Sequence, residues 1–286
     1  MPLDPQPDHV IFLHIPKTAG STLYRILERH YHFSQIYTIW QSGTLAEFNA
    51  LPAEKKQTIK LLRGHAGYGT HEQLPGRSAY FTILRNPSAR VVSYYHFIRR
   101  TPHHYCHHQI IKNQWTLPQF LENKADPMAD NAQTRLLAGL SSGQEVPFGT
   151  MTEAHLQRAK THLREMAVVG LTERFDETLF LLKDVFSWQK LHYARQNVTN
   201  PTKQSADLAP ETLEALQKVN HFDWALYDYA ETLLEEQLDN LGPDWPERIA
   251  QFQKQNERLR PLTNLLFNSR KYSVRTAIKR MLGNKR

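Results

Sequence analysis

Short apolar runs alternate with longer amphipathic segments along most of the chain. Apolar runs of strand length occur at residues 10–15, 35–39, 59–62, 80–84 and 168–172. Apolar residues at helical spacing occur at 21–31, 45–51, 88–99, 117–122, 131–138, 152–164, 175–186, 210–219 and 222–241. Buried strands that are joined by helices are typical of parallel sheets. The pattern therefore predicts an α/β fold, in which a P-loop-like parallel sheet carries helices on both faces.

This alternation ends at residue 241, so we expect an α/β domain over residues 1–241 and a helical, basic C-terminal extension over residues 242–286. The chain has 35 Lys and Arg against 28 Asp and Glu, a net charge of +7. Residues 265–286 contain seven basic side chains and no acidic one. The rest of the chain is therefore neutral overall, which argues against nucleic-acid binding.

The basic segment 265–286 has two interpretations. It could contact a membrane surface or an anionic partner as an amphipathic helix, or it could be a solvated chain end. The single cysteine, Cys106, excludes an internal disulfide framework and fits a reducing compartment. The polar N-terminus has no signal-peptide pattern, and no run of 18 apolar residues occurs. We expect a soluble, cytoplasmic protein of bacterial type.

A candidate anion site follows the first predicted strand. The loop there consists of Pro16, Lys17, Thr18, Ala19, Gly20, Ser21 and Thr22. Backbone N–H groups of such a loop and of the following helix N-terminus point at an anion, and the lysine adds a full charge. In the nucleotide triphosphatase loop, GxxxxGK[ST], the lysine directly follows a glycine. Here Lys17 precedes Gly20 by three positions, so the pattern predicts a different kind of phosphate site.

A second candidate anion site follows the strand predicted at 80–84. That strand ends in Arg85, and Ser93 lies two turns into the next helix. A guanidinium can bind a phosphate through two N–H groups. Taken alone, such an arginine more often caps a helix or pairs with a surface carboxylate. Because ligands bind at the carboxyl ends of parallel strands, two such sites together indicate a ligand with two separated phosphates.

These two segments resemble the cofactor sites of sulfotransferases that use 3′-phosphoadenosine 5′-phosphosulfate (PAPS), specifically the carbohydrate-type branch that contains heparan sulfate 2-O-sulfotransferase. Segments 131–139, 169–175 and 197–203 also resemble the family, in the expected order. The resemblance implies that Lys17, Thr18, Ala19, Gly20, Ser21 and Thr22 bind the 5′-phosphosulfate. It implies that Arg85 and Ser93 bind the 3′-phosphate, which the product 3′,5′-bisphosphate (PAP) retains. It places Thr199 and Lys203 in a loop that closes over the cofactor.

Sulfuryl transfer needs charge stabilisation on the leaving phosphate and a base for the acceptor hydroxyl. We expect Lys17 to supply the charge, and no metal, because the sulfuryl group carries only one negative charge. His65 lies on a glycine-rich loop just after the strand predicted at 59–62. Local sequence favours a histidine that hydrogen-bonds its own loop. The resemblance instead implies that His65 is the general base.

Several other residues are weaker candidates. Arg63 could bind an acidic acceptor or pair with a surface carboxylate, and Arg135 could bind the acceptor or lie on a helix surface. His14 is expected to be a core or near-site histidine, and Trp40 to be packing or part of a sugar site. The segment 103–108 contains four histidines and Cys106. It could hold a metal, although an exposed loop near the acceptor cleft fits the pattern better.

The sequence thus predicts an enzyme that transfers a sulfuryl group from PAPS to a hydroxyl of a carbohydrate-like acceptor. One alternative is a P-loop kinase that uses ATP and Mg²⁺, against which the missing GxxxxGK[ST] counts. The other is a non-catalytic anion-binding or membrane-binding adaptor that uses the basic segment 265–286.

Overall fold

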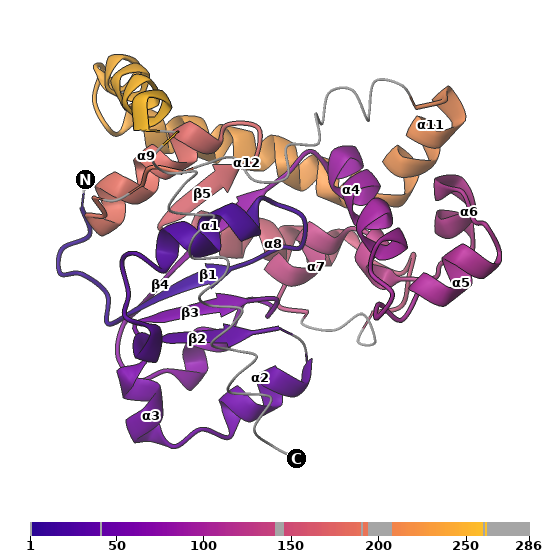
Figure 1. The fold of residues 1–286 in the computed structure, drawn as a ribbon, viewed down its shortest axis with the longest axis horizontal. Coiled ribbons are helices and arrows are strands. Elements are labelled where there is room, and N and C mark those ends of the chain that lie inside the picture. The colour runs from indigo at the N-terminus through magenta and orange to yellow at the C-terminus, as the bar shows by residue number, and fades with distance from the viewer. Residues whose placement is uncertain are drawn as a thin grey trace.

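Five parallel strands form the centre of the protein, in the order β2-β3-β1-β4-β5 (Figure 1). The computed structural model describes residues 2–40, 42–140, 146–189, 191–193, 208–259 and 261. The strands are β1 (His9–Leu13), β2 (Ile36–Ile39), β3 (Leu61–Gly64), β4 (Ser78–Leu84) and β5 (Val168–Leu171). All four strand pairs are parallel. The predicted fold class is confirmed.

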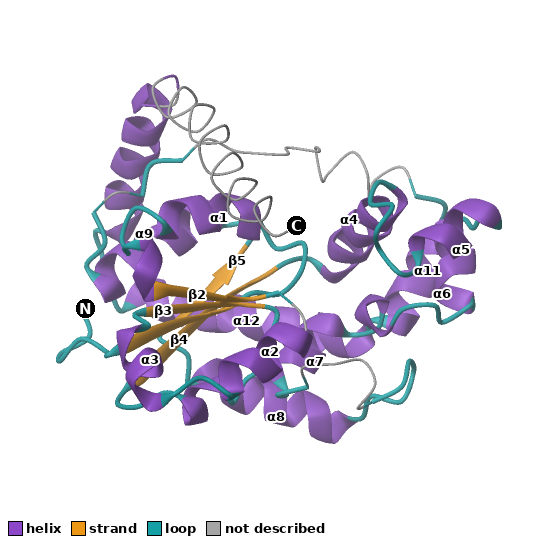
Figure 2. Cartoon of the chain, turned by 60° about the horizontal axis from the view of Figure 1, so that its bottom comes forward, coloured by secondary structure: helices purple, strands orange, loops and turns teal. Residues whose placement is uncertain are grey.

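Helices cover both faces of this sheet, with α1 over one face and α8 under the other (Figure 2). The longer helices are α1 (Gly20–Leu27), α2 (Ser42–Asn49), α4 (Pro87–Arg99), α8 (Glu153–Arg164), α9 (Phe175–Phe186), α11 (Pro210–Val219) and α12 (His221–Asp239). The shorter ones are α3 (Ala53–Thr58), α5 (His107–Lys112), α6 (Leu117–Glu122) and α7 (Ala132–Leu137). Every residue of β1 and β5 is buried, as expected for strands that are covered on two faces.

A second, smaller core lies beyond the sheet, between α4, α5, α6 and α11 (Figure 1). We call these four helices the helical lobe. Its core includes Val91, Ile98, Phe120 and Leu216, all fully buried. The helix α4 starts directly after β4 and therefore connects the sheet to the lobe. This arrangement places the lobe next to the carboxyl ends of the strands, where a ligand of a parallel sheet is expected.

Most predicted elements are present, with shifted ends. Two short helices, α3 and α5, were not predicted, because their sequences AEKKQT and HHQIIK lack apolar residues at helical spacing over a long enough stretch. Residues 245–259 are helical, as expected for the start of the extension, whereas residues 262–286 lie outside the described residues. The domain boundary at residue 241 stays a prediction. Within the described part of the chain, no helix is both long enough and apolar enough to cross a membrane.

Candidate functional site

The loop between β1 and α1 has an unusual backbone. Lys17 and Ala19 have φ angles of 75° and 61°, a left-handed conformation that is uncommon for residues with a Cβ. Left-handed residues in such a turn aim successive N–H groups to one side and so create an anion-binding concavity. The buried Thr18 hydroxyl donates to the carbonyl of Ile15 over 2.8 Å, and this bond holds the loop closed. The local sequence thus produces the backbone that the predicted phosphate site needs.

The side chain of His14 packs against this loop. Its buried ring contacts Gly20 so closely that a Cβ at position 20 would lie 1.9 Å from His14 Nε2. His14 Nδ1 is 2.9 Å from the hydroxyl of Tyr24. Burial, followed by the charges of His65, Arg63 and Lys17, holds the pKa of His14 well below its usual value. His14 is therefore a neutral supporting residue, in agreement with its expected place in or near the site.

The Lys17 side chain lies in a cation-rich setting. Its ammonium is 4.6 Å from the centroid of the Phe97 ring on α4. The pKa of Lys17 is lowered from 10.5 to about 8, mainly by burial and in addition by the charges of Arg100 and Arg85. Such an environment disfavours the charged lysine until a negative group is nearby. A bound anion would therefore raise the pKa of Lys17 and stabilise its charged form.

Arg85 lies directly beside this loop. It follows β4, the neighbour of β1 in the sheet, and its Nη1 donates to the Lys17 carbonyl over 3.1 Å. Its Nε is buried and has no hydrogen-bond partner among the described residues. Ser93 is half-buried on α4, whose N-terminus is capped by the Asn86 side chain. The structure thus brings the two predicted anion motifs into contact at one edge of the sheet.

His65 follows β3 at the same edge. Gly64 precedes it with φ 144° and approaches β2 so closely that a Cβ would lie 1.9 Å from the Ile39 carbonyl oxygen. His65 Nδ1 is 2.8 Å from the carbonyl oxygen of His14. A carbonyl only accepts, so Nδ1 carries the proton and Nε2 keeps its lone pair. Burial lowers the pKa of His65, so the ring is neutral at pH 7 and able to accept a proton.

Trp40 is the aromatic residue next to this histidine. Its ring centroid lies 6.5 Å from that of His65 and 5.7 Å from that of Tyr24. The side chain is 56% exposed, which is unusual for so large an apolar group. Of the two expectations for Trp40, its exposure fits a place at the edge of an acceptor site better than it fits core packing.

The two arginines that were predicted to bind substrate are both held inside the protein. Arg63 is buried and donates to Glu28 Oε1 over 2.8 Å, which agrees with the alternative of an ion pair. Arg135 is 1% exposed and pairs with Asp130 at 2.5 Å. Its Nη1 donates to the carbonyl of residue 146, and the Nη2 that pairs with Asp130 also donates to the carbonyl of residue 147. This geometry argues against both predicted acceptor contacts, because the donors already have partners.

The histidine-rich segment contributes to a buried polar cluster in the helical lobe. Ligand atoms of His104, Cys106 and Asp126 lie within 4.8 Å of one another. The Cys106 N–H points to His104 Nδ1, so the other ring nitrogen carries the proton. That nitrogen is 3.2 Å from the Tyr94 hydroxyl, which donates to Asp126 over 2.7 Å. Hydrogen bonds therefore account for this cluster, which the sequence could not indicate because Asp126 is distant in the chain.

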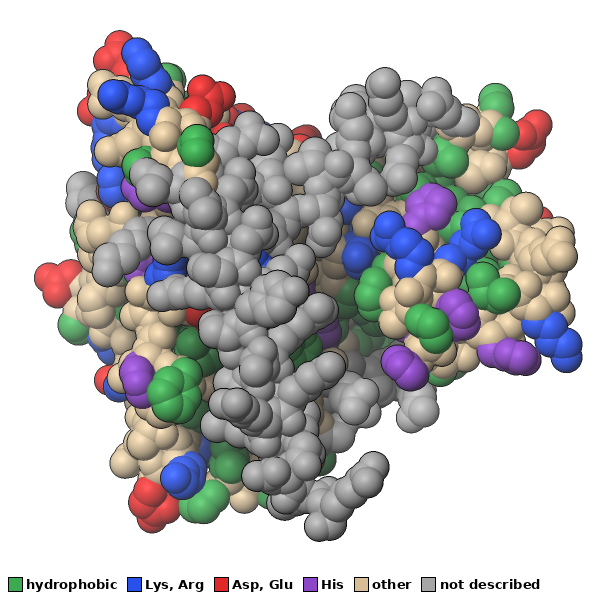
Figure 3. Space-filling model, in the orientation of Figure 1, with side chains coloured by type: hydrophobic (Ala, Val, Ile, Leu, Met, Phe, Trp, Pro, Cys, Tyr) green, Lys and Arg blue, Asp and Glu red, His purple; other side chains and the backbone are tan. Residues whose placement is uncertain are grey.

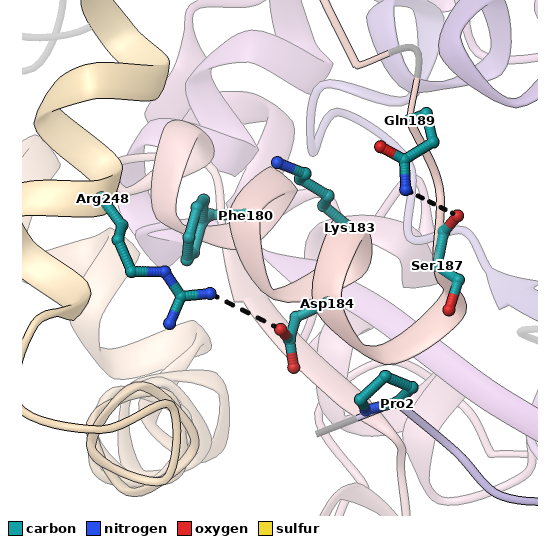
Figure 4. A pocket seen from close by; sticks show the side chains of 7 residues that line it. All are labelled: Pro2, Phe180, Lys183, Asp184, Ser187, Gln189 and Arg248. Carbon is teal, nitrogen blue, oxygen red and sulfur yellow. Dashed lines mark hydrogen bonds and ion pairs between the residues drawn. The ribbon is translucent and has the colours of Figure 1, made fainter.

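The surface of the protein has two notable features, a group of basic side chains and a hollow. Figure 3 shows histidine, lysine and arginine side chains gathered on the helical lobe. A separate hollow lies between α9 and residues 245–259, lined by Phe180, Lys183, Asp184 and Arg248 among others (Figure 4). There Arg248 pairs with Asp184 at 3.7 Å. Among the described residues, none of the predicted site residues lines this hollow. Thr199 and Lys203 lie outside the described residues, so their cofactor contact stays a prediction.

One residue with a clear place at the site was missed. Gln133 contacts the backbone of Arg85 through both ends of its side-chain amide. It belongs to segment 131–139, in which Arg135 was the predicted acceptor contact. No local pattern distinguishes these two residues, because the difference lies in their distant partners.

Comparison with known proteins adds relatives and a family. The chain is similar to heparan-sulfate 6-O-sulfotransferase 1-B of Danio rerio, with 26% identity over 80% of this chain and 66% of that protein. It is also similar to human heparan-sulfate 6-O-sulfotransferase 1, with 25% identity over 80% of this chain and 66% of that protein. The chain thus spans about two thirds of the length of these relatives. A solved structure of mouse SULT7A1 with PAP matches with 14% identity and a TM-score of 0.34, covering 80% of this chain and 89% of that one.

The predicted resemblance to the sulfotransferases is confirmed at the level of the family. A sequence model with the description "Sulfotransferase family" matches residues 4–230, which include every described residue of the site. The relatives named above are 6-O-sulfotransferases, so the 2-O branch and the bacterial type stay predictions. The match covers most of the chain, and the protein belongs to the sulfotransferase family.

Proposed function

We propose that this protein transfers a sulfuryl group from PAPS to a hydroxyl of a carbohydrate acceptor. The observation that carries the proposal is the contact between the two anion motifs, in which Arg85 Nη1 lies 3.1 Å from the Lys17 carbonyl oxygen. One ligand with two phosphates can therefore contact both motifs. Family membership and the names of the relatives support the same assignment.

The residues present fit such a ligand. The loop from Lys17 to Thr22 would hold the phosphosulfate through backbone N–H groups, and Arg85 and Ser93 would bind the 3′-phosphate. Lys17 has a lowered pKa and Arg85 has a buried Nε without a described partner, and an anion would satisfy both. Bound PAPS supplies a sulfuryl group on a phosphate leaving group. Thr199 and Lys203 remain part of the proposed cofactor site on the family resemblance alone.

In the proposed mechanism, His65 Nε2 accepts the proton of the acceptor hydroxyl. The Nδ1–H stays on the His14 carbonyl, which fixes the ring and stabilises the imidazolium that forms. The ammonium of Lys17 stabilises the charge on the leaving phosphate. The exposed Trp40 ring offers an apolar face to a sugar ring near the base. We assign no step to a metal, because the sulfuryl group carries only one negative charge and Lys17 stabilises the leaving phosphate.

Calorimetry and a transfer assay test this proposal together. PAP should bind in the micromolar range or tighter, while ATP with Mg²⁺ should bind much more weakly; the reverse order would favour a kinase. His65→Ala should leave PAP affinity within about twofold and lower transfer by about 10²–10⁴-fold. An unchanged transfer rate in this variant would remove the proposed base.

The acceptor is tested with radiolabelled PAPS over a panel of glycans that differ in their free hydroxyls. Transfer to a 6-hydroxyl would follow the names of the relatives, whereas transfer to a 2-hydroxyl would follow the motif resemblance. No transfer to any acceptor, together with vesicle binding that depends on residues 265–286, would instead support the adaptor.

A further inference from the structure

We propose that Gln133 is a positioning residue for Arg85. Its side-chain amide fixes the backbone of Arg85, and a buried network that is centred on Asp223 fixes Gln133 in turn. The inference rests on the proposed function, in which Arg85 binds the 3′-phosphate of the cofactor. It assigns to segment 131–139 the task of setting the direction of an anion-binding arginine, in place of direct contact with an acceptor.

The amide of Gln133 bonds to both polar backbone groups of Arg85. The Arg85 N–H donates to Gln133 Oε1 over 2.9 Å, and Gln133 Nε2 donates to the Arg85 carbonyl over 2.9 Å. The pairing of β4 with β5 ends one residue earlier, at Leu84. The side chain of Gln133 therefore replaces a neighbouring strand for one further residue. The backbone of Arg85 is therefore held by two hydrogen bonds, as it would be within the sheet.

Asp223 on α12 holds Gln133 in place. Its Oδ2 accepts from the Gln133 N–H over 3.2 Å, and its Oδ1 accepts from both the N–H and the hydroxyl of Thr134 over 2.8 Å. The Asp223 N–H donates to Asn131 Oδ1 over 3.0 Å. These side chains are at most 1% exposed. The first turn of α7 is thus capped by a carboxylate from another helix, which leaves Gln133 little freedom to move.

The same carboxylate also faces the helix that follows Arg85. Asp223 Oδ2 lies 4.0 Å from Nε of the fully buried Arg90 on α4. Asp223 is therefore shared between α4, which begins two residues after Arg85, and α7, which carries Gln133. The direction of the Arg85 guanidinium depends on both elements, so a rigid connection between them keeps it aimed at one place.

The test compares PAP with 5′-AMP, which lacks the 3′-phosphate, by calorimetry on the full chain. The measured quantity is the affinity ratio of PAP to AMP. Gln133→Met removes the amide at nearly equal length and should lower this ratio about tenfold, with AMP affinity changed less than twofold. In an Arg85→Ala background, the same substitution should leave the ratio unchanged. Thr134→Val is the matched control, since it removes the hydroxyl bond to Asp223 Oδ1 but keeps the Gln133 N–H on Oδ2 and both contacts with Arg85, and it should leave the ratio within about twofold.

Arg85→Ala tests the proposed role of Arg85, and Gln133→Met tests the positioning role of Gln133. If Arg85→Ala leaves the ratio unchanged, the proposed role of Arg85 is wrong and the inference loses its basis. If Arg85→Ala lowers the ratio but Gln133→Met does not, the positioning role alone is overturned. Gln133→Asn keeps an uncharged amide but shortens its reach to the Arg85 backbone, and it serves if the Met variant does not fold. Equal losses of PAP and AMP affinity in the folded variant would show a merely structural role and overturn the inference.

Discussion

Burial of Lys17 should make the unliganded protein less stable than it would be without that charge. The pKa falls from 10.5 to about 8, a difference of about 2.5 units. At about 1.4 kcal/mol per unit, this corresponds to about 3 kcal/mol at neutral pH. Because the pKa in the folded protein reflects every contact of the ammonium, including the Phe97 ring 4.6 Å away, this value is the net penalty of the buried charge.

Lys17→Met tests this magnitude, because it keeps the length of the side chain and the left-handed backbone while removing the charge. We expect the free energy of unfolding to rise by about 3 kcal/mol at pH 7, and Tm by about 6 °C. PAP binding should be lost in the same variant. Lys112→Met, at an exposed position of α5, is the control and should leave Tm unchanged.

The pH dependence gives a second, independent check. Between about pH 8 and pH 10.5 the unfolded chain keeps the Lys17 proton while the folded chain has lost it. Unfolding therefore takes up a proton, and wild-type stability rises with pH across this window. In urea titrations, the difference in unfolding free energy between Lys17→Met and the wild type should therefore be smaller at pH 9.5 than at pH 7. A variant that is less stable at pH 7, or a gap that does not narrow, would refute the reasoning.

Four further predictions follow from the site. PAP affinity should fall about tenfold per pH unit above pH 8, but stay flat in Lys17→Arg, because the lysine must be charged to bind the anion. The rate of sulfuryl transfer should stay constant as the pH is lowered past 6.5, because burial keeps the pKa of His65 below that value. A rate that falls to half at a pH above 6.5 would contradict this. Asp130→Ala should cost about 3–5 kcal/mol in urea unfolding by leaving buried Arg135 unpaired. Trp40→Ala should raise acceptor KM several-fold without changing PAP affinity.

Much of the framework follows from local sequence. The strand, loop and helix around Lys17 are contiguous, and so are those around Arg85, so each motif could be located without knowledge of the fold. Their contact could be anticipated as well, because the carboxyl ends of parallel strands share one edge of a sheet. The register of β1 beside β4 provides that contact. The state of His65, by contrast, depends on the His14 carbonyl, 51 positions away in the chain.

The assignments that needed structure are those with distant partners. The role of Arg63 became clear only from its ion pair with Glu28. In the sequence, an arginine that pairs with a carboxylate looks the same as an arginine that binds a ligand. Gln133 and Arg135 are two positions apart in one short helix and point to different partners, the Arg85 backbone and Asp130. Helical spacing puts them on different faces. It does not say which face meets the site.

His14 shows why these separate parts act as one site. Its ring lies against Gly20 and so sets the start of α1, while its carbonyl oxygen holds His65 Nδ1 at 2.8 Å. The positions of the anion loop and of the proposed base therefore both depend on His14, which directly follows β1. Any shift of that residue would move both, but would hardly change the distance between them. For a reaction in which the acceptor oxygen must meet a fixed sulfuryl group in line, a constant distance between donor loop and base is the property that matters most.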